Sequence, residues 1–122
     1  MRRKICIVED DAAVRESLKL VLEVNGYIVE DFETGSAFLK QGDFTRIACI
    51  VMDVYLPGGS GLQTLKRLRN QFVTTPVFLV TGRIDDSVRR EAIRLNATGI
   101  FEKPLSPRTL IDAIKTIESP AR

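Results

Sequence analysis

The stretch IACIVM at residues 47–52, which Asp53 follows at once, is the most hydrophobic part of the chain. A short apolar run that stops at a polar residue is typical of a strand buried on both faces of a parallel sheet. Residues 5–8, 77–80 and 100–101 have the same form, and residues 27–29 form a weaker run. We therefore expect five strands, with residues 47–52 at the centre of the sheet.

Amphipathic segments separate these runs. Over residues 12–24 apolar side chains recur at helical spacing, and Asn25-Gly26 ends the pattern. Similar patterns predict helices over residues 34–40, 62–68 and 85–96 and from Ser106-Pro107 onward, whereas residues 57–61 are expected to form a loop. Strands that alternate with helices predict an α/β fold: a doubly wound (βα)5 sheet in the order 2-1-3-4-5, between two helical layers.

Composition narrows the function. The chain has 122 residues, enough for a single domain, and 18 basic against 16 acidic side chains give a net charge of +2, which indicates no nucleic-acid surface. Histidine is absent, and Cys6 and Cys49 lie in apolar runs, so we expect two buried free thiols in a reducing compartment. No run has the length of a membrane span or a signal-peptide core, which predicts a cytoplasmic protein.

The polar residues gather where the expected strands end. Glu9-Asp10-Asp11 follow the first strand, Asp53 the third, Thr81 ends the fourth, and Lys103 follows the fifth. Crowded carboxylates repel each other unless a cation lies among them, and a site made only of oxygen ligands suits Mg²⁺. An Asp nucleophile, a cation and nearby donors are what phosphoryl transfer to a carboxylate requires. Each residue alone is as well explained as a cap or a turn, so the combination carries the interpretation.

The same residues resemble the receiver domain of two-component response regulators. Val8-Glu9-Asp10-Asp11 is similar to the family's acidic pair, and residues 51–61 are similar to its phosphoacceptor loop. Leu79-Val80-Thr81-Gly82 and Phe101-Glu102-Lys103-Pro104 resemble the other two motifs. The resemblance extends from about Lys4 to Ile117, and the text of the motifs is most similar to the FixJ-type branch.

The resemblance implies a CheY-like, flavodoxin-like fold and a role for each motif residue. Asp53 would accept a phosphoryl group from a phosphohistidine of a sensor histidine kinase. Mg²⁺, or Mn²⁺ in its place, would be held by Asp10, by Glu9 through a water, by Asp53 and by the backbone carbonyl of Tyr55. Lys103, with a cis bond to Pro104, and Thr81 would contact the phosphoryl group, and movement of Thr81 would be the switch. Such a domain catalyses only weak self-phosphorylation and self-dephosphorylation and is not an enzyme in the usual sense.

Two features depart from the family pattern or extend beyond the site. Glu9 stands where Asp is commoner, and Ile100 stands where the family has its aromatic switch residue, with Phe101 pointing to the opposite face.

Ile93 and Ile100 are candidates for a homodimer contact on the face formed by the last two helices and the strand between them. The resemblance makes residues 1–122 one receiver domain, with 118–122 as the possible start of a linker to a helix-turn-helix, DNA-binding output domain that these residues lack.

Two other functional classes were weighed. A phosphate-independent pseudo-receiver or scaffold would lack the acceptor, an acid of the pair or the lysine, and all are present here. A flavodoxin-like enzyme would need a phosphate-binding loop rich in Ser, Thr and Gly after the first strand, where this chain has three acids. A haloacid-dehalogenase-like phosphatase would need its nucleophile after that same strand, whereas here the candidate follows the third.

Overall fold

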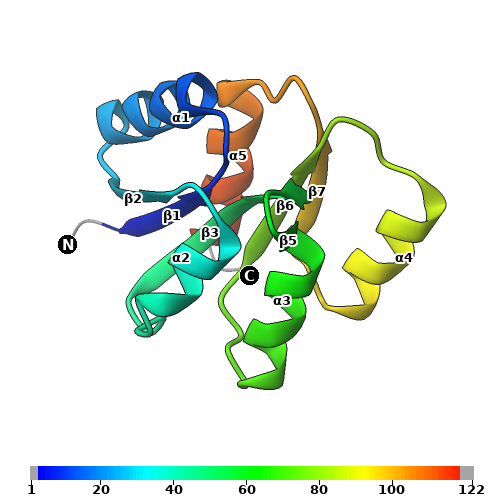
Figure 1. Ribbon diagram of the computed structural model, residues 1–122. Coiled ribbons are helices and arrows are strands. Elements are labelled where there is room, and N and C mark those ends of the chain that lie inside the picture. The colour runs from blue at the N-terminus through cyan, green and yellow to red at the C-terminus, as the bar shows by residue number, and fades with distance from the viewer. Residues whose placement is uncertain (1–2, 119–122) are drawn as a thin grey trace.

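The computed structural model describes residues 3–118, which form a five-stranded parallel sheet between two layers of helices (Figure 1). The sheet order is β2-β1-β3-β6-β7, so the strands follow the expected order once a small separate hairpin is set aside. The elements in chain order are β1 (Lys4–Val8), α1 (Ala12–Val24), β2 (Ile28–Phe32), α2 (Gly35–Lys40), β3 (Ile47–Asp53), β4 (Tyr55–Leu56), β5 (Gly59–Ser60), α3 (Gly61–Asn70), β6 (Val77–Thr81), α4 (Asp86–Arg94), β7 (Gly99–Glu102) and α5 (Pro107–Glu118).

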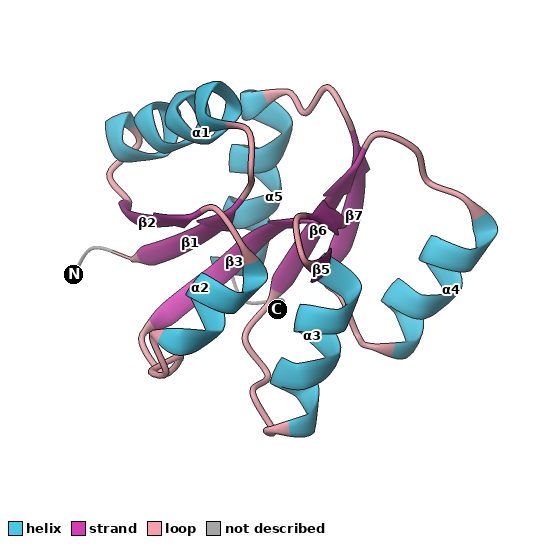
Figure 2. Cartoon of the chain, in the orientation of Figure 1, coloured by secondary structure: helices cyan, strands magenta, loops and turns pink. Residues whose placement is uncertain are grey.

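Alternation along the central strand divides the core into two halves. Ile50 and Met52 of β3 pack with side chains of α2, α3 and α4, whereas Cys49 and Val51 pack with side chains of α1 and α5. Figure 2 shows the same division, with α1 and α5 on one face of the sheet and the other three helices opposite. Because both faces are covered, β3 is apolar almost throughout, and its polar residue Asp53 comes at the end that the helices leave open.

Three local features differ from the sequence expectations. Residues 57–61 are not a plain loop, because β4 and β5 pair antiparallel around Pro57-Gly58 as a two-residue hairpin. β2 starts at Ile28 and continues through Glu30 and Asp31, because this edge strand has one face open to charged side chains. β7 is longer than expected and runs from Gly99 to Glu102.

Cys6 and Cys49 are buried free thiols, and burial raises the pKa of each to about 12, as the apolar runs predicted. None of the helices over residues 3–118 is both long and apolar enough to cross a membrane. Of the expected linker residues 118–122, Glu118 is the last residue of α5, and residues 119–122 lie outside the described part of the chain.

Candidate functional site

Three carboxylates meet at the carboxyl edge of the sheet. Glu9 follows β1 and Asp53 ends β3, and both side chains are buried, with relative exposures of 4% and 5%. One carboxylate oxygen from each of these residues and one from the exposed Asp10 all lie within 4.8 Å of one another. β1 and β3 are neighbours in register, with Val8 opposite Met52, which is why Glu9 and Asp53, 44 positions apart in the chain, converge.

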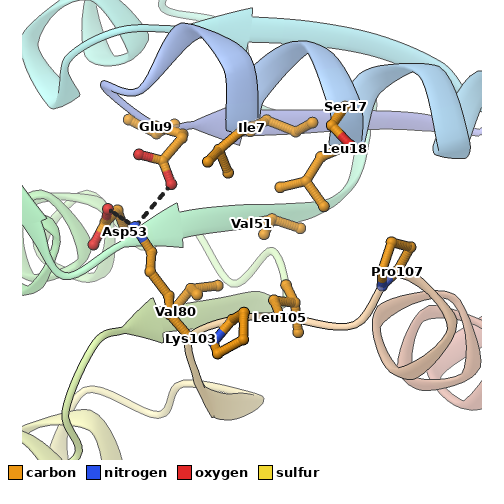
Figure 3. Close-up of a pocket in the computed structure, with 13 residues that line it drawn as sticks. Ile7, Glu9, Ser17, Leu18, Val51, Asp53, Val80, Lys103, Leu105 and Pro107 are labelled. Atoms are coloured by element: carbon orange, nitrogen blue, oxygen red, sulfur yellow. Dashed lines mark hydrogen bonds and ion pairs between the residues drawn. The ribbon is translucent and has the colours of Figure 1, made fainter.

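Lys103 lies among these acids. Its Nζ donates to Asp53 Oδ2 at 2.7 Å and to Glu9 Oε1 at 3.0 Å (Figure 3). Burial opposes the charge of this ammonium, but its bonds to the two carboxylates outweigh burial and raise the pKa of Lys103. Burial also raises the pKa of Glu9, although the Asp11 amide and Lys103 both favour its charged form. The lysine therefore acts as the counter-ion of a buried acidic cluster.

The loop after β3 is shaped around Asp53. The backbone N–H of Tyr55 donates to Asp53 Oδ1 at 3.1 Å, so both carboxylate oxygens of Asp53 already accept a hydrogen bond. The N–H of Gly61 donates to the carbonyl of Val54 at 2.7 Å, which returns the chain to β3 after the hairpin. A Cβ at Gly61 would lie 2.1 Å from the carbonyl oxygen of Asp53, so this close approach requires glycine.

Thr81 lies at the end of β6, fully buried, but its hydroxyl is engaged elsewhere. Oγ1 donates to the carbonyl of Arg83 at 3.1 Å and accepts from the Arg83 N–H at 3.4 Å. The backbone N–H of Lys103 donates to the Thr81 carbonyl at 2.7 Å, but among the described residues the Thr81 hydroxyl makes no hydrogen bond to Asp53 or Lys103. The structure thus brings the acids and the lysine together and leaves the threonine hydroxyl bonded within its own loop.

Asp11 of the acidic run and Arg15 of the first helix hold the acidic loop in place. Asp11 is the N-cap of α1, where its carboxylate accepts from the backbone N–H groups of Ala13 and Val14. Arg15, one turn further on, donates from Nη1 to the carbonyl oxygen of Glu9 at 2.8 Å. The spacing between the acidic run and the start of the helix was a usable signal for the cap, whereas nothing in the sequence distinguished Arg15 from the other charged residues of α1.

The acidic cluster fits a small hard cation. Mg²⁺ binds oxygen at about 2.0–2.1 Å, so two oxygens on the same ion lie at most about 4.2 Å apart, and the three carboxylate oxygens are already within 4.8 Å of one another. Glu9, Asp10 and Asp53 would hold the ion. The Tyr55 carbonyl, expected as a fourth ligand, belongs to the residue whose N–H is already tied to Asp53.

Of the residues expected at the switch and the dimer face, Ile100 and Phe101 belong to β7 and Ile93 belongs to α4. Ile100 packs against the core half under α2, α3 and α4, whereas Phe101 packs in the opposite half, with its ring centroid 5.7 Å from that of Phe78. Ile93 on α4 is 71% exposed. Ile100 and Phe101 therefore point to opposite faces as expected, and the dimer contact stays a prediction.

A cleft of about 480 Å³ opens beside the acidic cluster on the α1 and α5 side of the sheet (Figure 3). Glu9, Asp53 and Lys103 lie at one end of it, and the remaining walls are mostly apolar: Ile7, Val14, Leu18, Val51, Val80 and Leu105. The carboxylates of Glu9 and Asp53 thus lie beside a cleft whose walls are mostly apolar.

Comparisons of the sequence and of the structure with known proteins both find receiver domains. The response regulator receiver domain family matches residues 5–115. The transcriptional regulatory protein FixJ of Azorhizobium caulinodans is 38% identical over 89% of this chain and 52% of its own length, and the phosphate regulon regulator PhoB of Escherichia coli is 34% identical over 96% and 52%. The chain therefore spans about half the length of these relatives.

Solved receiver structures superpose on nearly the whole chain. A CheY-like receiver domain from Methanospirillum hungatei has a TM-score of 0.90 at 27% identity and covers 97% of this chain and 95% of its own. The structure titled FixJ-N has a TM-score of 0.85 at 29% identity, over 100% and 98% of the two chains.

Proposed function

Because this chain belongs to the response regulator receiver domain family, whose general function is a phosphorylation switch, we propose that Asp53 is its phosphoacceptor. The observation that carries the proposal is the cluster itself. Asp53 is the buried acid at the end of the central strand, and Lys103 Nζ lies 2.7 Å from one of its oxygens. An Asp in this position has a counter-ion ready for the charge that phosphorylation adds.

In the proposed reaction, a carboxylate oxygen of Asp53 attacks the phosphorus of a phosphohistidine on a sensor histidine kinase. The new O–P bond forms as the P–N bond breaks, and the imidazole leaves with the bonding electron pair. Mg²⁺, or Mn²⁺, bound by Glu9, Asp10 and Asp53 would neutralise charge on the transferring oxygens. Lys103 keeps its place and donates to a phosphoryl oxygen. Small donors such as acetyl phosphate would allow the weak self-phosphorylation of such a domain, and water its self-dephosphorylation.

The switch is proposed to follow from Thr81. Its hydroxyl would leave the Arg83 backbone and donate to a phosphoryl oxygen, which moves the loop between β6 and α4. A phosphoryl group shifts this equilibrium only by bonding Thr81 better in one loop position than in the other. Ile100, beside α4 in the same core half, would fill the space that Thr81 vacates, and the exposed Ile93 offers a contact for a homodimer through α4, β7 and α5.

The output is proposed from the relatives. FixJ and PhoB are named transcriptional regulators about twice as long as this chain, so we propose that residues 1–122 are one receiver domain that controls a DNA-binding domain. The pseudo-receiver alternative is not favoured, because the acceptor, the acidic pair and the lysine are all present and adjacent.

The test of the acceptor is intact mass after incubation with acetyl phosphate and Mg²⁺. The wild type should gain one phosphoryl mass, and Asp53→Asn should gain none. Asp43→Asn, an exposed acid at the opposite edge of the sheet, is the matched control and should be labelled like the wild type. An Asp53→Asn variant labelled at the wild-type rate would remove the assignment.

A further inference from the structure

Arg15 holds the backbone of the acidic pair from behind. Its Nη1 donates to the carbonyl oxygen of Glu9 at 2.8 Å and lies 3.4 Å from that of Asp10. Its Nε donates to Asp31 Oδ2 of β2 at 3.0 Å, and only 16% of its side chain is exposed. One guanidinium thus ties α1, the edge strand and both acidic residues into a single network.

Asp10 has few other restraints. It is exposed, and among the described residues its carboxylate accepts no hydrogen bond. It nevertheless lies within 4.8 Å of two other carboxylates, which repel it. Its position must therefore come from the backbone, and Arg15 bonds the carbonyl groups of Glu9 and Asp10, which belong to the two peptide units on either side of the Asp10 Cα.

We propose that Arg15 is a positioning residue for the cation site: it fixes the peptide planes at Glu9 and Asp10 and thereby places the carboxylate of Asp10 for Mg²⁺. The inference rests on the proposed function, since it assumes that these acids hold the ion. Arg15 itself contacts neither the ion nor the phosphoryl group. Partners that orient a ligand in this way typically matter 10–100-fold for metal affinity.

Two effects of Arg15 on a cation have opposite signs. Its positive charge repels Mg²⁺, whereas its hydrogen bonds preorganise the ligands. Asp31 pairs with Arg15 Nε at 3.0 Å and offsets part of its charge, although Asp31 is shared with Lys19 Nζ at 3.5 Å. We expect the positioning effect to be the larger one, so removal of the guanidinium should weaken Mg²⁺ binding rather than strengthen it.

The test is calorimetric titration of the full chain with MgCl₂. Arg15→Met keeps the aliphatic stem and removes every donor, so its Kd for Mg²⁺ should rise about tenfold. Arg15→Lys, which can reach Asp31 or a carbonyl but cannot supply the forked set of bonds, should give an intermediate Kd. The acetyl phosphate rate of Arg15→Met should recover at saturating Mg²⁺, a split that a general loss of structure would not produce.

Lys19→Met is the matched control, because Lys19 shares Asp31 with Arg15 but bonds neither carbonyl. Its Kd should stay within twofold of the wild type. Unchanged or tighter binding in both Arg15 variants would overturn the proposal, as would equal weakening in Lys19→Met, which would assign the effect to Asp31. A wild type that binds no Mg²⁺ would overturn the proposed function and this inference together, whereas normal binding by Arg15→Met would overturn this inference alone.

Discussion

Removal of the Lys103 charge tests whether the acidic cluster is held by its counter-ion. In Lys103→Met, Glu9 and Asp53 stay buried, at 4% and 5% exposure, without the ammonium that lies 3.0 Å and 2.7 Å from them. Breaking a buried ion pair by deleting one partner costs about 3–5 kcal/mol. The Lys103 side chain is 34% exposed, so solvent screens part of the interaction and we expect a loss of about 2–4 kcal/mol at pH 7 without Mg²⁺.

The pH dependence has a definite sign. In the wild type the pKa of Lys103 is raised, so its contribution is fully present below the unfolded value of 10.5 and is lost only above the folded value. In the variant Glu9 loses a partner that favours its charged form, so the folded pKa of Glu9 rises further above its usual value. A raised acid pKa destabilises the folded state above that pKa and not below the unfolded value. The loss in Lys103→Met should therefore shrink as the pH falls from 7 to 5.

Magnesium, like a lower pH, should reduce the stability loss in Lys103→Met, because the bound cation replaces the missing ammonium. Mg²⁺ should stabilise Lys103→Met more than the wild type, by RT ln(1 + [Mg²⁺]/Kd) with a smaller Kd. Urea unfolding at pH 5 and 7, with and without Mg²⁺, measures the stability loss and its dependence on pH and Mg²⁺. Lys66→Met, at an exposed position of α3, is the control and should change stability by less than about 0.5 kcal/mol. A stability loss in Lys103→Met that depends on neither pH nor Mg²⁺ would mean that the wild-type Lys103 stabilises the fold by packing of its aliphatic chain and not by its charge.

Three further tests, with five variants in all, probe separate parts of the site. In calorimetry Asp10→Ala should weaken Mg²⁺ binding, whereas Asp11→Ala should leave the Mg²⁺ affinity nearly unchanged. In urea unfolding Asp11→Ala should lose about 1 kcal/mol of stability, because Asp11 caps α1. Equal losses of Mg²⁺ affinity in the two variants would contradict the ligand assignment. Thr81→Ala should keep phosphorylation but lose any association induced by beryllofluoride in sedimentation. Gly61→Ala should lose about 1–3 kcal/mol by overpacking against the β3 carbonyl, whereas Gly82→Ala, which has open space, should be near neutral in the same unfolding assay.

The strand order and the place of the site were predictable because they depend on patterns that are local in sequence. The apolar run at residues 47–52 identified the central strand, and the rule that parallel strands present their carboxyl ends at one edge brought Glu9, Asp53 and Lys103 to that edge. Receiver motifs then supplied a role for each residue. The boundaries of β2 and the hairpin of β4 and β5 were not predictable in this way, because both depend on the neighbours that a strand meets in space.

The sequence could not predict the contacts in which a side chain of one element hydrogen-bonds to, or packs against, the backbone of another. Arg15 is one of several charged residues on α1, and its spacing from the acids is that of any solvated helix face. Its role appears only when β2 places Asp31 beside it, since that pairing turns the guanidinium toward two carbonyl groups. Gly61 is similar: the turn chemistry of its loop explains a glycine, but only the 2.1 Å approach to Asp53 shows that no other residue fits. The acids proposed to hold the cation could therefore be identified from the sequence, whereas the contacts of Arg15 with their backbone could not.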